Sequence, residues 1–156
     1  MLFAFFNVAA YAQISASAFD VTGSDTKFIG IISSGTKVSY DLTPGEHTLM
    51  VVGESADFMK ATVLAGKTYY ALVTPRMGAM KARFSFDPVR QSQLAGKEFS
   101  KWDSSCDLVE NTPESLAWAE KNAGSIGGKR ARYWPAWSEK PQDQRDAQTL
   151  KEEDGR

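Results

Sequence analysis

The sequence predicts a mainly β fold, an antiparallel β-sandwich of about seven or eight strands with a short helical C-terminal extension. Residues 1–90 contain short β-branched and aromatic runs, separated by Gly and Pro turn signals at the spacing typical of sandwiches. No convincing crossover helix interrupts these runs, which argues against a parallel α/β sheet. Residues 91–156 instead contain helix-forming residues and all four tryptophans. We therefore assign residues 1–90 to a β-sandwich domain and residues 91–156 to a helical extension with a polar tail.

Length and composition limit the classes of function. A chain of 156 residues, 42% hydrophobic and 24% charged, has the size of one globular domain with its own core. Its 18 basic and 19 acidic residues nearly balance, so no overall field attracts nucleic acid. One Cys and one His exclude an internal disulfide and a four-ligand Cys/His zinc site. We expect no cofactor, no bound metal and no nucleic-acid partner.

The N-terminal apolar run, Leu2 to Ala12, has two interpretations. A buried strand is favoured, because the run is rich in sheet-forming residues and has the length of a strand. The alternative is a remnant of a secretory signal, since Ala10-Tyr11-Ala12 has the small-x-small form of a cleavage site. No Lys or Arg precedes Lys27, so the basic start of a signal peptide is missing.

Further strands are predicted from alternation of inward and outward residues, with period two. Pro44 and Gly45 supply the backbone angles of a tight turn between two of them. Leu49 and Leu72 are assigned to the core. The predicted strands cover Ile14–Val21, Lys27–Ile32, Lys37–Leu42, His47–Val52, Phe58–Leu64, Thr68–Thr74 and Lys81–Asp87.

The extension shows a weaker helical pattern. Short helical pieces are expected over Gln93–Phe99 and Asp103–Glu110. A clearer helix begins at Thr112, where a Thr N-cap precedes a Pro at the first helical position. This helix is expected to stop at Gly124, with a flexible joint over residues 125–128. Residues 138–156 are almost wholly polar, which predicts a solvated helix or a disordered tail.

Three turn-containing motifs resemble a known class of domain. They are Phe28-Ile-Gly30, Leu42-Thr-Pro-Gly-Glu-His-Thr-Leu49 and Leu64-Ala-Gly-Lys-Thr-Tyr-Tyr70. Together they resemble small bacterial envelope domains of unknown function, often lipoproteins, with a PEGA-like β-sandwich. The resemblance covers about residues 2–89. It implies an exported, non-catalytic module that binds an unknown protein or another envelope component, with membrane association only through an upstream anchor. A cytoplasmic location stays open, because no complete signal peptide is present.

His47 and Cys106 are the two candidates for catalytic residues. His47 would need a nucleophile and an orienting acid, for which Ser39, Asp41 and Glu46 are the nearest candidates in sequence. A structural His that bonds to turn backbone is favoured. Cys106 has acidic neighbours that would raise its pKa, so a reactive thiolate is not expected. We therefore expect a binding or structural module and no enzyme, with a small hydrolase that uses His47 as the alternative.

One basic-aromatic cluster in the extension is the best candidate for partner contact. Guanidinium groups pair with anions and indole rings favour interfaces, although Trp134 and Trp137 more often pin such an extension onto a sheet. Glycan binding by an exposed aromatic, with Tyr69 and Tyr70 on opposite strand faces, is a further alternative. The candidate partner-contact residues are Lys129, Arg130, Arg132, Tyr133, Trp134 and Trp137.

Overall fold

The first half of the chain forms eight strands at the positions that the alternation predicts. The structure is a computed structural model that describes residues 1–6, 14–77 and 82–156. The strand interpretation of the N-terminus is confirmed for residues 2–6, while Ala10–Ala12 and Lys81 lie outside the described residues. The strands are β1 (Leu2–Phe6), β2 (Ser15–Asp20), β3 (Lys27–Ser33), β4 (Thr36–Tyr40), β5 (Gly45–Val52), β6 (Ala56–Val63), β7 (Tyr69–Met77) and β8 (Ala82–Pro88).

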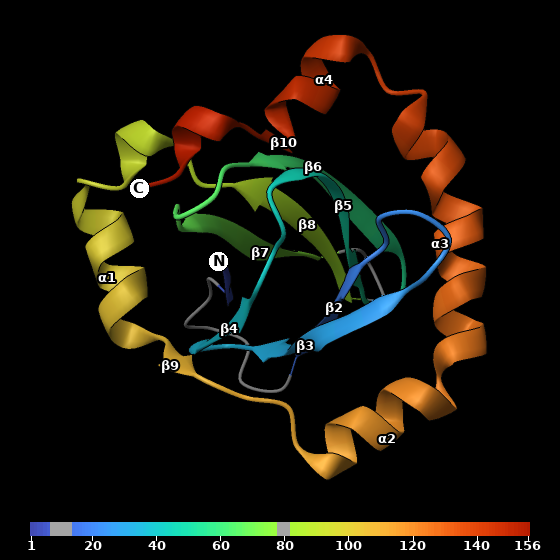
Figure 1. The fold of residues 1–156 in the computed structure, drawn as a ribbon. Coiled ribbons are helices and arrows are strands. Elements are labelled where there is room, and N and C mark those ends of the chain that lie inside the picture. Colours follow the sequence, from blue (N-terminus) through green and yellow to red (C-terminus); the bar gives the residue numbers. More distant parts are fainter. Residues whose placement is uncertain (7–13, 78–81) are drawn as a thin grey trace.

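Residues 91–156 form a belt of short elements around these strands, which we call the C-terminal belt. Figure 1 shows its four α-helices placed around the strands, so that the C-terminus returns to the neighbourhood of α1. The belt consists of η1 (Gln91–Gln93), α1 (Lys97–Ser105), β9 (Asp107–Leu108), α2 (Pro113–Lys121), α3 (Ala123–Ser138), α4 (Gln142–Ala147), β10 (Thr149–Leu150) and η2 (Glu152–Asp154).

The strands form two five-stranded sheets that share one apolar core. The first has the order β8-β7-β1-β4-β9, and the second has the order β10-β6-β5-β2-β3. Leu2, Val38 and Phe86 of the first sheet meet Ile32 and Leu49 of the second in this core. Leu49 is fully buried, as predicted. Leu72 is only partly buried and packs outside this core, against the residues beneath α1.

The sheets are mixed, so the prediction of a purely antiparallel fold is wrong. The N-terminal strand β1 lies between β4 and β7 and runs parallel to β7, with Leu2 opposite Tyr69 and Phe6 opposite Val73. Two belt strands add further parallel pairs, β9 with β4 and β10 with β6. The consecutive strands that lie in one sheet do pair antiparallel: β2 with β3, β5 with β6, and β7 with β8. The parallel pairs all join distant segments, whose pairing no local pattern specifies.

The C-terminal belt covers the outer faces of both sheets. Phe99 of α1 packs edge-on against Tyr70 of β7, with ring centroids 4.8 Å apart. On the other sheet, Ile126 and Trp137 of α3 pack on a cluster that includes Phe58 of β6. The belt and the strands therefore pack together through three apolar clusters: the core between the sheets, the cluster beneath α3 and the cluster beside α1.

The structure corrects two predictions about the belt. Residues 125–128 are helical and belong to α3, where a flexible joint was expected. The helix continues through these glycines because Ile126 and Trp137 anchor it to the sheet from both ends. The α2 helix begins as predicted, with the Thr112 hydroxyl accepting from the Ser115 amide. The predicted helical piece Asp103–Glu110 is wrong, because α1 ends at Ser105 and Asp107–Leu108 form the strand β9.

The polar C-terminal segment is folded, where a solvated helix or disordered tail was predicted. Leu150 is fully buried in the shared core, and its strand β10 pairs with β6. The buried Asp154 carboxylate accepts from the Arg90 guanidinium at 2.8 Å. Backbone hydrogen bonds in both directions join Arg156 to Thr68. A single apolar side chain and these polar contacts hold the segment, which composition alone does not reveal.

Two glycine substitutions test the packing of the belt. Gly127 lies within α3 and a Cβ there would meet no other atom, whereas a Cβ on Gly155 would lie 2.7 Å from the Tyr69 ring. We expect Gly127→Ala to raise the free energy of unfolding by about 0.5–1 kcal/mol. We expect Gly155→Ala to lower it by about 1–3 kcal/mol through overpacking. Urea denaturation measures both, and a neutral Gly155→Ala would contradict the packing of the C-terminus on Tyr69.

Candidate functional site

Arg130 of the predicted contact cluster is used to hold a loop. Its guanidinium donates to the carbonyl oxygens of Val21, Gly23, Ser24 and Asp25, at distances between 2.6 and 3.3 Å. It also donates to the Thr26 hydroxyl at 3.2 Å. A planar group with five N–H donors suits this set of acceptors. Arg130 therefore fixes the β2–β3 connection against α3.

The two tryptophans of the cluster pack on the second sheet. Trp134 lies edge-on against Phe58 with centroids 5.1 Å apart, and it stacks on Trp137 at 5.4 Å. Trp137 is 3% exposed, and its indole N–H donates to the Gln148 side chain at 3.0 Å. Rings stacked on each other in this way do not form a flat exposed platform of the kind that binds glycans. Tyr69 and Tyr70 are both buried, on opposite faces of β7.

Arg132 and Tyr133 are the cluster members with the fewest contacts to the sheets. Arg132 is exposed, and its guanidinium lies 5.5 Å from the centre of the Tyr133 ring. Tyr133 is partly buried at the border of the α3 cluster. The structure thus places the six predicted residues on one helix, but most of them face the strands. Contact with a partner through Arg132 stays a prediction.

The two arginines provide a matched pair of variants. Arg130→Ala removes all five hydrogen bonds to the β2–β3 connection, and we expect it to lower the free energy of unfolding by about 1–3 kcal/mol. Arg132→Ala, two residues away on the exposed face, should change it by less than about 0.5 kcal/mol. Urea denaturation compares them. Equal effects would contradict the structural role of Arg130.

Lys129, the remaining member of the cluster, lines a cavity of about 230 Å³, which we call the Lys129 cavity. The cavity lies between the second sheet and the region where α2 meets α3. The strands and the helices each contribute both polar and apolar side chains to its lining. The lining residues include Ser15, Ser17, Asn122, Ser125 and Lys129 with Trp118, Ile31, Val52 and Ile126.

The helices position this lining by regular spacing. Trp118, Asn122, Ser125 and Lys129 recur at intervals of three or four residues, which places them along one helical face. Asn122 separates α2 from α3, and its side-chain amide donates to the Trp118 carbonyl at 2.8 Å. The sequence analysis missed Trp118, Asn122 and Ser125. Their spacing would have been visible if residues 113–138 had been interpreted as nearly continuous helix.

Lys129 has an unusual electrostatic environment. Its ammonium donates to the Gly53 carbonyl oxygen and is half-buried. Among the residues that the structure describes, no carboxylate forms an ion pair with it. It is also the sole ionisable residue in the described lining of the cavity. The cavity therefore has a net positive charge at one wall.

His47 contacts turn backbone, as the sequence analysis favoured. Its Nε2 lies 2.7 Å from the Thr43 carbonyl oxygen, so this nitrogen carries a proton and donates. Its Nδ1 lies 3.4 Å from the Thr22 hydroxyl and 3.7 Å from the Asp20 carboxylate. Thr22 already donates to Asp20. A hydroxyl and an acid on the same ring nitrogen do not form a relay of the Ser-His-Asp kind, in which they face opposite nitrogens.

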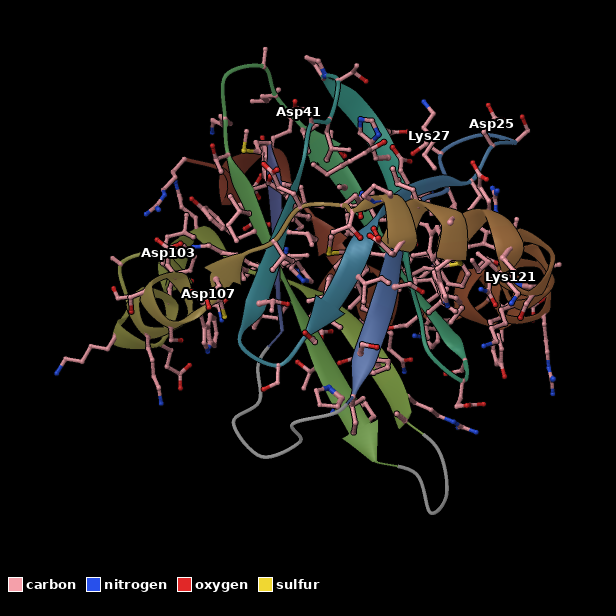
Figure 2. All side chains as sticks on the ribbon, turned by 90° about the horizontal axis from the view of Figure 1, so that it is seen from below. Asp25, Lys27, Asp41, Asp103, Asp107 and Lys121 are labelled. Atoms are coloured by element: carbon pink, nitrogen blue, oxygen red, sulfur yellow. The ribbon has the colours of Figure 1, made fainter. Side chains whose placement is uncertain are left out.

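Residues around His47 make one end of the strands polar. Asp41 and Lys27 lie at this end (Figure 2) and line a small cavity together with Tyr40 and His47. Burial, and secondly the charge of Asp20, raises the pKa of the Tyr40 hydroxyl. Asp20 and Thr22 were missed as neighbours of His47, because they come from β2 and its following turn, 25 or more residues away.

Asp57 of β6 is the ionisable group of a polar network beneath the belt. Its carboxylate accepts from the Phe86 amide at 3.0 Å and from the Gln148 side chain at 2.7 Å. The Lys140 ammonium nitrogen lies 3.8 Å from a carboxylate oxygen of Asp57. Burial raises the pKa of Asp57 above its ordinary value, and the hydrogen bonds and Lys140 only partly offset this effect.

The raised pKa of Asp57 has a definite consequence for stability. Because the folded state disfavours the ionised form, the contribution of Asp57 to the free energy of unfolding should fall as pH rises from 3.8 through its folded pKa. Carboxyl ¹³C NMR should give a titration midpoint above 3.8 in the folded protein, and an ordinary midpoint in urea. A folded midpoint at or below 3.8 would contradict the dominance of burial.

Cys106 is a buried thiol beneath α1. Burial is the main cause that raises its pKa, with smaller contributions from Asp107 and Asp103. The direction agrees with the prediction, although the acidic neighbours are not the principal cause. A raised pKa keeps the sulfur protonated and weakly nucleophilic.

Within residues 1–6, 14–77 and 82–156, no group of three or more His, Cys, Asp or Glu side chains could hold a metal ion. None of the helices in this part of the chain combines the length and the apolar character that crossing a membrane requires. Comparison with family models, curated proteins and solved structures finds no match.

Proposed function

We propose that the chain is a non-catalytic binding module of the bacterial cell envelope, and that the Lys129 cavity is its ligand site. In this proposal the two sheets are a β-sandwich frame, and the C-terminal belt completes the site. The envelope assignment rests on the resemblance of residues 2–89 to PEGA-like domains. The binding assignment rests on the cavity itself.

The composition of the cavity is the observation that carries the proposal. Ligand sites combine an apolar wall with a few polar groups that fix orientation, and the Lys129 cavity has both. Two independent parts of the chain contribute to it, since Ser15 and Ser17 come from β2 while Ser125 comes from α3. The arrangement of His47 favours binding over hydrolysis, because its Nε2 is already bonded to the Thr43 carbonyl.

Blocking the mouth of the cavity tests this proposal. Ser125 is an exposed lining residue, so Ser125→Trp should cover the opening without replacing a buried side chain. We expect the neutral fluorescent probe N-phenyl-1-naphthylamine to bind the unmodified protein and to lose about tenfold or more in affinity with Ser125→Trp. Fluorescence titration measures both affinities.

Ala131→Trp is the matched control, since it adds the same side chain to an exposed position of α3 that does not line the cavity. This variant should bind the probe as the unmodified protein does. Absence of probe binding, or equal loss in both variants, would refute the cavity as a ligand site. A thermal melt of each variant verifies that it is folded.

A further inference from the structure

We infer that the Lys129 cavity recognises a small organic carboxylate, with the Lys129 ammonium as the partner of the acid group and Trp118 as the contact for an apolar body. This inference rests on the proposed function and specifies its ligand class.

The charge of Lys129 is the first argument. A half-buried ammonium loses part of its hydration, and the single carbonyl of Gly53 is a neutral partner that does not balance the charge. The ammonium has three N–H donors, and within the described part of the chain only Gly53 accepts from it. A carboxylate in the cavity would accept from these donors in a charge-assisted hydrogen bond. No acidic residue in the described lining would repel it.

The neighbouring polar groups suit an acceptor-rich ligand. The hydroxyls of Ser15, Ser17 and Ser125 can each donate one hydrogen bond. The Ser17 hydroxyl has only a long bond of 3.4 Å to the Val52 carbonyl, although its residue is 5% exposed. Each of these features favours negative charge in the cavity.

The apolar wall indicates a ligand with more than an acid group. Trp118 is 39% exposed although it is a large aromatic side chain, and Ile126 and Val52 continue the apolar surface into the cavity. Phe28 lies against the Trp118 indole, with ring centroids 6.3 Å apart, and restricts its orientation. A flat or branched apolar body against Trp118 would cover this surface. A bare inorganic anion would leave it exposed.

Two probes of nearly the same shape distinguish the effect of charge on affinity from the effect of shape. Indole-3-acetate and indole-3-acetamide differ in one atom of the acid group, and only the first is charged. Both are titrated into ¹⁵N-labelled full-length protein, with the Trp118 indole N–H and the amides of Asn122 and Ser125 as reporters. We expect both probes to shift these signals, and the acetate to bind about tenfold more tightly, as one charge-assisted contact predicts.

Three lysine variants identify the cation. Lys129→Met keeps the apolar stem and should abolish the preference for acetate while acetamide still binds. Lys129→Arg restores the charge and should restore the preference. Lys121→Met is the control, because Lys121 lies on the exposed end of α2 (Figure 2) and does not line the cavity. It removes the same formal charge from the protein and should leave the preference unchanged.

The outcomes distinguish the inference from the proposed function. Equal affinity for the two probes, or a preference that persists in Lys129→Met, would overturn carboxylate recognition while the cavity remains a binding site. If neither probe shifts the reporter signals, both the inference and the cavity as a ligand site are refuted. Dispersed ¹⁵N spectra of each variant verify that the protein is folded.

Discussion

The structure depends on one constraint, the need to cover apolar residues on the outer faces of both sheets. The shared core hides one face of each sheet, but Phe19, Met50 and Phe58 remain on one outer face and Tyr70 remains on the other. Short strands cannot hide these side chains by themselves. The C-terminal belt covers them with α3 and α1, so it is as much a part of the hydrophobic core as the strands are.

The same constraint explains where the cavity lies. The belt is fixed tightly at its end, where Asp154 pairs with Arg90 and Arg156 bonds to Thr68, and along the second half of α3, where Trp137 is buried. Along α2, by contrast, no residue is buried. The Lys129 cavity opens at this loosely packed place.

Local sequence patterns predicted the strands but not their partners. Alternation with period two, together with apolar runs of strand length and turn signals, located the strands of residues 1–90. It could not indicate that β1 pairs parallel with β7, since this depends on residues more than 60 positions apart. Glycine signals failed at residues 124–128 because tertiary anchoring by Ile126 outweighs low helix propensity. Lys129 was singled out from the sequence, whereas Trp118 and Asn122 required the fold.

Two adjacent basic residues of α3 show that residue type alone does not distinguish a structural role from a binding role. Arg130 and Lys129 both turn toward the strands, yet among the residues that the structure describes Arg130 has five oxygen acceptors and Lys129 has one. Both terminal nitrogens of the Arg130 guanidinium are bonded to the β2–β3 connection, and removal of this side chain acts on stability. An ammonium with a single neutral partner retains donors and an uncompensated charge. We infer binding because the Lys129 ammonium lines an open cavity and has a neutral carbonyl, and no carboxylate, as its partner among the described residues. The local density of basic residues does not by itself support this inference.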